Sequence, residues 1–318
     1  MHLVDMHCDT LLECYKKKCG LRKNNCHIDL EKMKSSNAFI QFFAAYLPSG
    51  DDAVEEGVSL SPYDLFYALK DIYDHELNVN ADLMKPILSY GDVECNQQNG
   101  KMYGLLTIED GELLGGKIER IDELYHAGVR LITLLWNKEN CIGYPHNTDN
   151  QAHKKGLKPF GIEVVKKMNE IGMIIDVSHL SEGGFYDVAK YSKKPFVASH
   201  SCARALCSHS RNLTDEQLRC IAKAGGIVGV NYNAGFLRDG AEYSSIEDIL
   251  LHIDYVLSLI GSEHVALGSD FDGIDCDLEM NGYGQYGKLV NALSEKYSDD
   301  IVEKICYKNA LRVLKDCL

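Results

Sequence analysis

The sequence predicts an α/β fold, a (β/α)8 barrel of the TIM type. Short β-rich segments alternate with helical patterns along all 318 residues, and the predicted strands are nearly continuous apolar runs, typical of a parallel sheet covered by helices. A doubly wound open sheet is the alternative, but no Gly-rich dinucleotide or P-loop motif follows the first strand. We expect one domain over residues 1–318.

Eight segments are predicted to be strands, because they are short, apolar and bounded by turn residues. In chain order they are Leu3–Met6, Ala38–Leu47, Met102–Glu109, Val129–Leu135, Met173–Ser178, Pro195–His200, Gly226–Tyr232 and His264–Asp270.

The helices between these strands have recognisable ends. Ser61 followed by Pro62 predicts one helix start, and capping boxes are predicted for Thr214 with Gln217 and for Ser244 with Glu247. Glycines at positions 128, 172, 225 and 261 are expected to end helices, because a left-handed residue often follows the last turn. The longest irregular stretch, about 137–156, is predicted to be a lid or substrate loop.

Composition excludes several functions. The chain has 47 acidic and 33 basic residues, a net charge of −14, which argues against nucleic acid as a partner. No apolar run approaches the roughly 18 residues that span a bilayer, so no membrane association is expected. The twelve cysteines contain no CxxC pair and are expected to be reduced thiols of a cytoplasmic protein. The sequence leaves a homodimer open.

Polar side chains follow the first predicted strand. His7 and Asp9 are two residues apart, and alternation along a strand sends both toward the barrel mouth. Cys8 between them is expected to face the helix layer as a small buried hydrophobe. Taken alone, this triplet also fits a hydrogen-bonded core.

Four other strands end in similar chemistry, with Glu109, His179, His200 and Asp270. Active sites of such barrels lie at the C-terminal face, built from the ends of different strands. The histidines and Glu109, together with the two ligands of the first strand, give five N/O ligands that suit two divalent metals sharing a carboxylate. The sequence therefore predicts a binuclear metal site at this face. Five separately satisfied polar core residues are the alternative.

Eight short motifs extend over nearly the whole chain: DMHCDT (5–10), TIEDG (107–111), GLKPFG (156–161), DVSH (176–179), ASHS (198–201), RNL (211–213), GSDFDG (268–273) and NALRV (309–313). In this combination and order they resemble the membrane (renal-type) dipeptidases, peptidase family M19 of the amidohydrolase superfamily. The resemblance implies a (β/α)8 barrel, two Zn²⁺ ions or other divalent metals, and hydrolysis of dipeptides, some with a D-residue at the second position.

The resemblance also implies roles for the metal ligands. By position, His7 and Asp9 match the ligands of one zinc, and His179 and His200 match those of the other. Glu109 matches the carboxylate that bridges both ions, and is therefore counted with the catalytic residues.

Two further roles are implied by position. Asp270 matches the acid/base residue of the family, and Arg211 matches the residue that binds the free carboxylate of the substrate. Asp272 lies beyond the strand end and is expected to tether the following loop. Tyr232 and Asn231 follow the seventh strand and are expected near the pocket, with Tyr232 predicted to contact substrate.

One position departs from the family pattern. Many members have a histidine that polarises the scissile carbonyl where this chain has Trp136. We expect Trp136 to contact substrate, and His146 or His153 on the following loop to replace the missing histidine. Action of a zinc ion alone is the other explanation.

The predicted ligands indicate a mechanism. Even one zinc brings the pKa of a bound water to about 7, so a water shared by two ions supplies hydroxide to attack the peptide carbonyl. Asp270 is expected to take the proton and deliver it to the departing amine.

Two other functions remain open from the sequence. A TatD-like metal-dependent phosphoesterase also uses a barrel with His, Glu and Asp ligands, although its first strand usually carries HxH and few Lys or Arg residues lie near the strand ends here. The second is a non-catalytic barrel that retains metals, which stays possible because Trp136 stands in place of the family's histidine.

Overall fold

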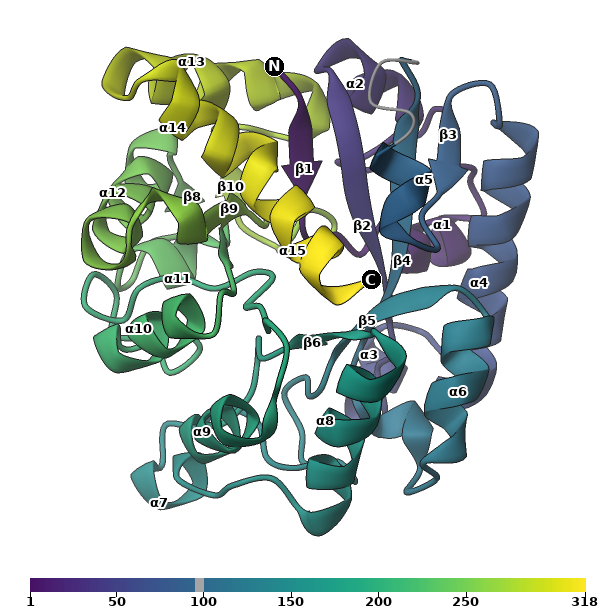
Figure 1. Ribbon diagram of the computed structural model, residues 1–318. Helices are drawn as coiled ribbons and strands as arrows, with labels where there is room; N and C mark the ends of the chain where they lie inside the picture. The colour runs from purple at the N-terminus through teal and green to yellow at the C-terminus, as the bar shows by residue number, and fades with distance from the viewer. Residues whose placement is uncertain (95–99) are drawn as a thin grey trace.

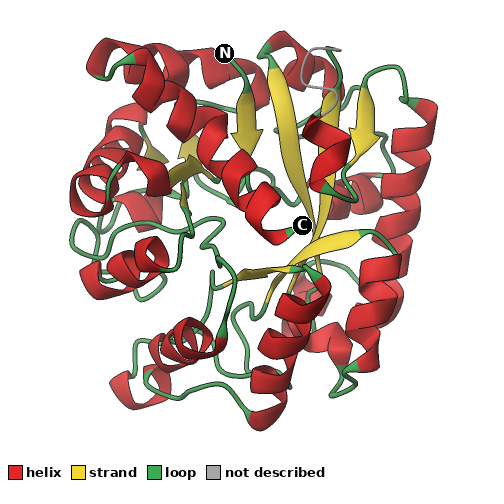
Figure 2. Cartoon of the chain, viewed as in Figure 1, coloured by secondary structure: helices red, strands yellow, loops and turns green. Residues whose placement is uncertain are grey.

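A computed structural model describes residues 1–94 and 100–318. Its centre is a curled parallel sheet with helices packed around it (Figures 1 and 2). Among the described residues, the strands hydrogen-bond in the order β6-β5-β4-β2-β1-β9-β7, and β3 pairs with β4. The bounds of these strands are β1 Leu3–Asp5, β2 Ala38–Tyr46, β3 Met84–Pro86, β4 Met102–Glu109, β5 Val129–Thr133, β6 Ile174–Asp176, β7 Val228–Val230 and β9 Val265–Leu267. A separate pair joins β8 (Tyr243–Ser244) to β10 (Asp277–Leu278).

The predicted parallel sheet covered by helices is confirmed, and one of the predicted strands is wrong. The segment 195–200 is not a regular strand: Val197 bridges to Asp176 and Ala198 bridges to Val228, each as a single pair. A side chain takes part in place of strand-to-strand backbone hydrogen bonds here: the backbone N–H of Ser199 donates to Asp176 Oδ1 at 2.9 Å. The two bridges connect β6 with β7, the two ends of the strand order. β3 was not predicted from the sequence.

Helices fill the intervals between strands. Their bounds are α1 Thr10–Lys17, α2 Leu30–Ser35, α3 Asp51–Glu55, α4 Pro62–Val79, α5 Tyr90–Glu94, α6 Glu119–His126, α7 Asn150–His153, α8 Pro159–Ile171, α9 Glu182–Tyr191, α10 Asp215–Lys223, α11 Ala234–Leu237, α12 Ile246–Ile260, α13 Tyr286–Lys296, α14 Asp299–Glu303 and α15 Asn309–Cys317. Short 3-10 turns cover Gly111–Leu114, Ser262–His264 and Tyr283–Gln285, and a π-turn covers Lys304–Lys308. Among the described residues, no helix is both long and apolar enough to cross a membrane.

Most predicted helix ends are confirmed. Ser61 caps α4, and Thr214 with Gln217 forms a capping box on α10. The start of α12 was misplaced by one residue: Ser245 is the cap, because Ser244 belongs to β8. The four predicted glycine stops all have positive φ, between 77° and 100°, a conformation that favours glycine.

Strand alternation divides the core into two clusters. Leu105 and Leu131 belong to a smaller cluster that includes residues of α15, whereas their neighbours Leu106 and Ile132 belong to the larger cluster, in which helices such as α4 and α8 pack on the sheet. Successive strand residues point to opposite faces, so each strand is held from both sides. This double burial fixes the positions of the residues that follow each strand.

Candidate metal and active site

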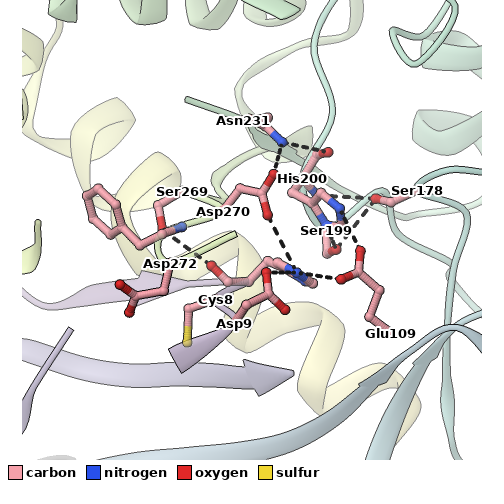
Figure 3. A network of polar contacts seen from close by, with 12 residues as sticks. Cys8, Asp9, Glu109, Ser178, Ser199, His200, Asn231, Ser269, Asp270 and Asp272 are labelled. Atoms are coloured by element: carbon pink, nitrogen blue, oxygen red, sulfur yellow. Dashed lines mark hydrogen bonds and ion pairs between the residues drawn. The ribbon is translucent and has the colours of Figure 1, made fainter. Parts of the chain in front are cut away.

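Six ionisable side chains from five separate segments converge where the strands end. They are His7, Asp9, Glu109, His179, His200 and Asp270. Each is at most 8% exposed to solvent. Figure 3 shows Asp9, Glu109, His200 and Asp270 close together. The chain therefore brings together all five residues predicted as metal ligands and the one predicted as acid/base.

Glu109 lies at the centre of this cluster. Its Oε1 is 3.0 Å from His179 Nε2 and 3.4 Å from His200 Nε2, and its Oε2 is 3.5 Å from His7 Nε2. On the far side, His7 Nε2 is 3.3 Å from Asp9 Oδ2 and 3.7 Å from Asp270 Oδ1. The carboxylate of Glu109 thus faces two groups of side chains at once.

The hydrogen bonds of two histidines show which ring nitrogens are acceptors. His179 Nδ1 is 2.9 Å from Asn137 Oδ1, and a carbonyl oxygen only accepts. His200 Nδ1 is 2.7 Å from Ser199 Oγ, whose own proton goes to Asp176. Because burial lowers the pKa of both imidazoles well below the usual value, each ring has one proton, on Nδ1. Both Nε2 lone pairs therefore point into the cluster, 3.0 Å apart.

Burial and neighbouring charges also shift the pKa values of the other groups in the cluster. Burial, with the charges of Asp9 and Asp270 adding to it, raises the pKa of Glu109 to about 8. Burial alone would lower the pKa of His7, but Glu109 and Asp9 raise it well above its usual value. His7 Nε2 and Asp9 Oδ1 are buried without a hydrogen-bond partner. A divalent cation would take the place of the proton that these carboxylates favour on His7, and the nitrogen and oxygen ligands that converge here suit such a cation.

Ligand atoms in two overlapping triplets approach closely enough to share a cation. Atoms of His7, Glu109 and His200 lie within 4.8 Å of one another, as do those of His7, Asp9 and Asp270. The donor set of this cluster therefore fits metal ions.

Two residues of the cluster have a strained backbone. His179 has φ of 66° and Asp270 has φ of 62°, a left-handed conformation that non-glycine residues adopt infrequently. Such strain persists where the surrounding structure enforces it, and it clusters at functional sites. Both residues lie three positions after the end of a strand, β6 for His179 and β9 for Asp270.

Asp270 and Asp272 have different surroundings. Asp270 Oδ2 accepts a 2.8 Å hydrogen bond from Asn231 Nδ2, and burial raises the pKa of Asp270. Asp272 accepts from Thr10 Oγ1 and from the backbone of His27, both at 2.6 Å. The prediction that Asp272 tethers a loop is confirmed, whereas Asp270 faces the cluster.

A cavity of about 330 Å³ opens above the cluster. Asp9, Glu109, His179 and Asp270 line it, and so do Leu12, Glu13, Lys16, Tyr46, Glu56, Trp136, Asn137, Asn233, Phe236, Asp272, Gly273 and Asp275. Its volume lies in the range of small-molecule sites. The one Lys or Arg among these lining residues is Lys16, which is paired with Glu13 at 2.8 Å and with Glu56 at 2.6 Å.

Arg211 is a buried cation next to the cluster. It is 3% exposed, and its guanidinium donates to Ser201 Oγ at 2.9 Å and to the carbonyl oxygen of His200 at 3.0 Å. Its Nε has no hydrogen-bond partner. No carboxylate of the described residues lies within ion-pair distance of it, and Phe236 of the cavity wall lies 5.8 Å away.

The residues predicted to contact substrate lie in different places. Trp136 lines the cavity, with its ring 4.8 Å from that of Tyr46 and 6.3 Å from that of His179. His146 is not among the residues that line the cavity, and its Nδ1 is 2.9 Å from Ser210 Oγ.

Tyr232 is not brought to the cavity, which corrects its predicted place. Its side chain is 1% exposed, packs against Phe271, and donates its hydroxyl to Tyr286 at 3.3 Å. Strand alternation is the reason. Asn231, the preceding residue, faces Asp270, so Tyr232 faces the helix layer.

Sequence reasoning missed the residues that hold the histidines. Asn137 and Ser199 fix the Nδ1 atoms of His179 and His200, and Asp176 accepts from both the backbone and the side chain of Ser199. Each of these residues lies near a strand end, which is the signal that could have identified them.

Comparison with known protein families gives a match over almost the whole chain. The family model of the membrane dipeptidases, peptidase family M19, matches residues 1–317. The chain belongs to this family. By family it is therefore a metallo-dipeptidase, which agrees with the resemblance of its sequence motifs to those of the M19 dipeptidases.

Individual relatives of this M19 chain were also found. It is 37% identical over 265 residues to an uncharacterized protein of Klebsiella pneumoniae, with 80% of this chain and 97% of that one covered. It is 30% identical over 295 residues to the dipeptidase tcpJ of Claviceps purpurea, with 91% and 69% covered. A metallopeptidase of Rhodobacter sphaeroides, solved with a phosphinate mimic of L-Ala-D-Ala, has a TM-score of 0.90 and 26% identity, covering 100% of this chain and 99% of that one.

Proposed function

We propose that this chain is a zinc-dependent dipeptidase that hydrolyses dipeptides with a free C-terminal carboxylate. The observation that carries the proposal is the convergence of three histidines and three carboxylates, from five segments, on buried acceptor atoms below a small cavity. The matching M19 family and its dipeptidase relatives support the reaction class. The proposal includes a single domain with a closed (β/α)8 barrel.

Two divalent cations are proposed to bind in this cluster. His7 and Asp9 would hold one, His179 and His200 the other, and Glu109 both, as its position between the two groups suggests. Bound cations of this kind lower the pKa of water and polarise carbonyl groups.

Asp270 is proposed to move the proton. Its carboxylate lies next to His7 and lines the cavity, and burial raises its pKa, which favours accepting a proton. Asn231 holds Oδ2 and leaves Oδ1 toward the cluster. An amine leaves an amide bond only when it is protonated, so the same carboxyl group would return the proton to it.

Arg211 is proposed to bind the carboxylate of the substrate. A buried guanidinium without an ion-pair partner is costly, and a substrate carboxylate would supply the missing charge. The charges of Asp270 and Glu109 already act on Arg211, so a carboxylate bound there would lie close to the reacting groups. This contact would restrict the enzyme to substrates that end near the cleaved bond.

Trp136 is proposed to form an apolar wall for substrate side chains, since it lines the cavity beside Tyr46. We also propose that a D-residue is accepted at the second position, as the L-Ala-D-Ala mimic bound to the Rhodobacter sphaeroides protein suggests. The eleven cysteines of the described residues are all free, which supports a reducing compartment such as the cytoplasm.

A dipeptide library tests the proposal. Protein loaded with zinc should hydrolyse dipeptides with L- or D-residues at the second position, and a chelator should abolish the reaction. A phosphoesterase is not favoured, because Lys16 is the only Lys or Arg that lines the described cavity and it is already paired.

A further inference from the structure

Asn137 lies at the junction of the cluster and the loop that follows β5. It lines the cavity, and its Oδ1 is 2.9 Å from His179 Nδ1 and 3.1 Å from His146 Nε2. One oxygen atom thus faces two imidazole nitrogens from different segments. No role in catalysis follows from the family match for this side chain.

The direction of these hydrogen bonds follows from the neighbouring groups. His179 needs its Nε2 lone pair for the cluster, so its Nδ1–H donates to Asn137. His146 Nε2 faces the same carbonyl oxygen, which only accepts, so Nε2 must carry a proton. Ser210 Oγ, 2.9 Å away, donates to His146 Nδ1. His146 Nε2–H and His179 Nδ1–H therefore both point to Asn137 Oδ1.

Two donors on Oδ1 fix the orientation of the amide of Asn137. Its Nδ2, at the other end of the amide, has no acceptor among the described residues, and the side chain is exposed to the cavity. The amide therefore presents two N–H groups to whatever occupies the cavity, beside His179 and within the wall that also contains Trp136.

We propose that Asn137 has two roles: its Oδ1 positions His179 for metal binding, and its Nδ2 donates a hydrogen bond to the carbonyl oxygen of the bond being cleaved. The inference rests on the proposed function and deepens it. Negative charge grows on that oxygen during attack, and a donor that is already oriented stabilises such charge at little reorganisation cost. Asn137 is thus a positioning residue through its Oδ1 and a catalytic residue through its Nδ2.

Asn137→Ala tests the first role. Removing the acceptor frees the His179 ring, and loss of such outer partners typically weakens metal binding by about 10- to 100-fold. Titration calorimetry with Zn²⁺ should show this loss for one of two equivalents, without any activity measurement. Metal binding equal to that of the unaltered protein would overturn the positioning role.

Asn137→Asp tests the second role. The carboxylate keeps an acceptor for both histidines but has no N–H, so two zinc equivalents should still bind tightly. Loss of one such donor costs on the order of 10²–10³-fold in kcat, with a smaller change in KM. Asn233→Asp is the matched control, because it adds the same charge to the same cavity while Asp still caps α11.

The two variants separate the possible results. A fall in kcat for Asn137→Asp that exceeds the fall for Asn233→Asp, with metals retained, supports the donor role. Equal falls in the two variants overturn it. If the unaltered, zinc-loaded protein hydrolyses no dipeptide, the proposed function and the donor role both fail, whereas the calorimetry of Asn137→Ala still decides whether Asn137 positions His179.

Discussion

The Nε2 atoms of His179 and His200 lie 3.0 Å apart, and both carry lone pairs. Glu109 Oε1 is 3.0 Å from the first and 3.4 Å from the second. Three acceptor atoms this close repel one another, so a cation that they share would stabilise the arrangement. The outer partners Asn137 and Ser199 hold the rings in this orientation.

We expect the purified protein to bind about two equivalents of a divalent metal, because two groups of ligands share Glu109. Glu109→Ala should lose the pair, since Glu109 is the one side chain that faces both groups. Elemental analysis after zinc loading measures the stoichiometry. Glu139→Ala, on the exposed loop surface, is the control. At most one equivalent in excess zinc would contradict the binuclear site.

Asp270→Asn should keep its metals and lose turnover. The amide is nearly isosteric and its oxygen still accepts from Asn231, but it cannot accept and return a proton. General acid–base groups contribute on the order of 10²–10⁴ in rate, so kcat should fall by that factor. Steady-state kinetics with parallel metal analysis checks this. Turnover close to that of the unaltered enzyme would exclude the acid/base role.

Arg211→Ala should impair hydrolysis of free dipeptides far more than hydrolysis of dipeptide amides. Hydrogen bonds between charged groups contribute roughly 1.5–3 kcal/mol, so kcat/KM on the free acid should fall about 10- to 100-fold or more. Most of the change should be in KM, because the contact exists before the reaction begins. A dipeptide amide already lacks the negative charge of the C-terminal carboxylate, so the loss of Arg211 should affect its hydrolysis much less.

Measuring both substrates with both enzymes isolates the pairing from general damage to the fold. Equal losses on acid and amide would show that Arg211 does not bind the carboxylate.

Gly268→Ala should destabilise the protein. Its added Cβ would lie 1.9 Å from the carbonyl oxygen of Ser199, so the backbone that carries His200 would have to move. Overpacking of this kind costs about 1–3 kcal/mol. In contrast, Gly287→Ala in α13 meets no atom within 4 Å and should stabilise by about 0.4–1 kcal/mol. Urea unfolding of both variants measures the difference, and equal stabilities would contradict the close packing around Ser199.

The parallel sheet and the convergence of polar side chains at one end of it were predictable because they depend on local periodicity. Alternation along a strand places His7 and Asp9 on one face, and parallel strands bring their carboxyl ends together. The family motifs added Arg211 and the acid/base role expected of Asp270. No long-range information was needed to expect these residues at one end of the sheet.

Features that depend on tertiary contacts were not predictable. Segment 195–200 reads as a strand, but side chains of Asp176 and Ser178 take its backbone N–H groups. Ser245 rather than Ser244 caps α12, because Ser244 belongs to strand β8, which pairs with β10. The contact of Asn137 with His146 depends on how the loop after β5 folds back, which no local pattern encodes.

The most direct test is hydrolysis of L-Ala-D-Ala and L-Ala-L-Ala by zinc-loaded protein, beside chelator-treated protein and a phosphodiester substrate. The account predicts turnover of dipeptides that is lost with the chelator and regained on adding zinc, and no comparable turnover of the phosphodiester. Cleavage of the phosphodiester instead, or no hydrolysis of any dipeptide by protein that holds two zinc equivalents, would contradict it.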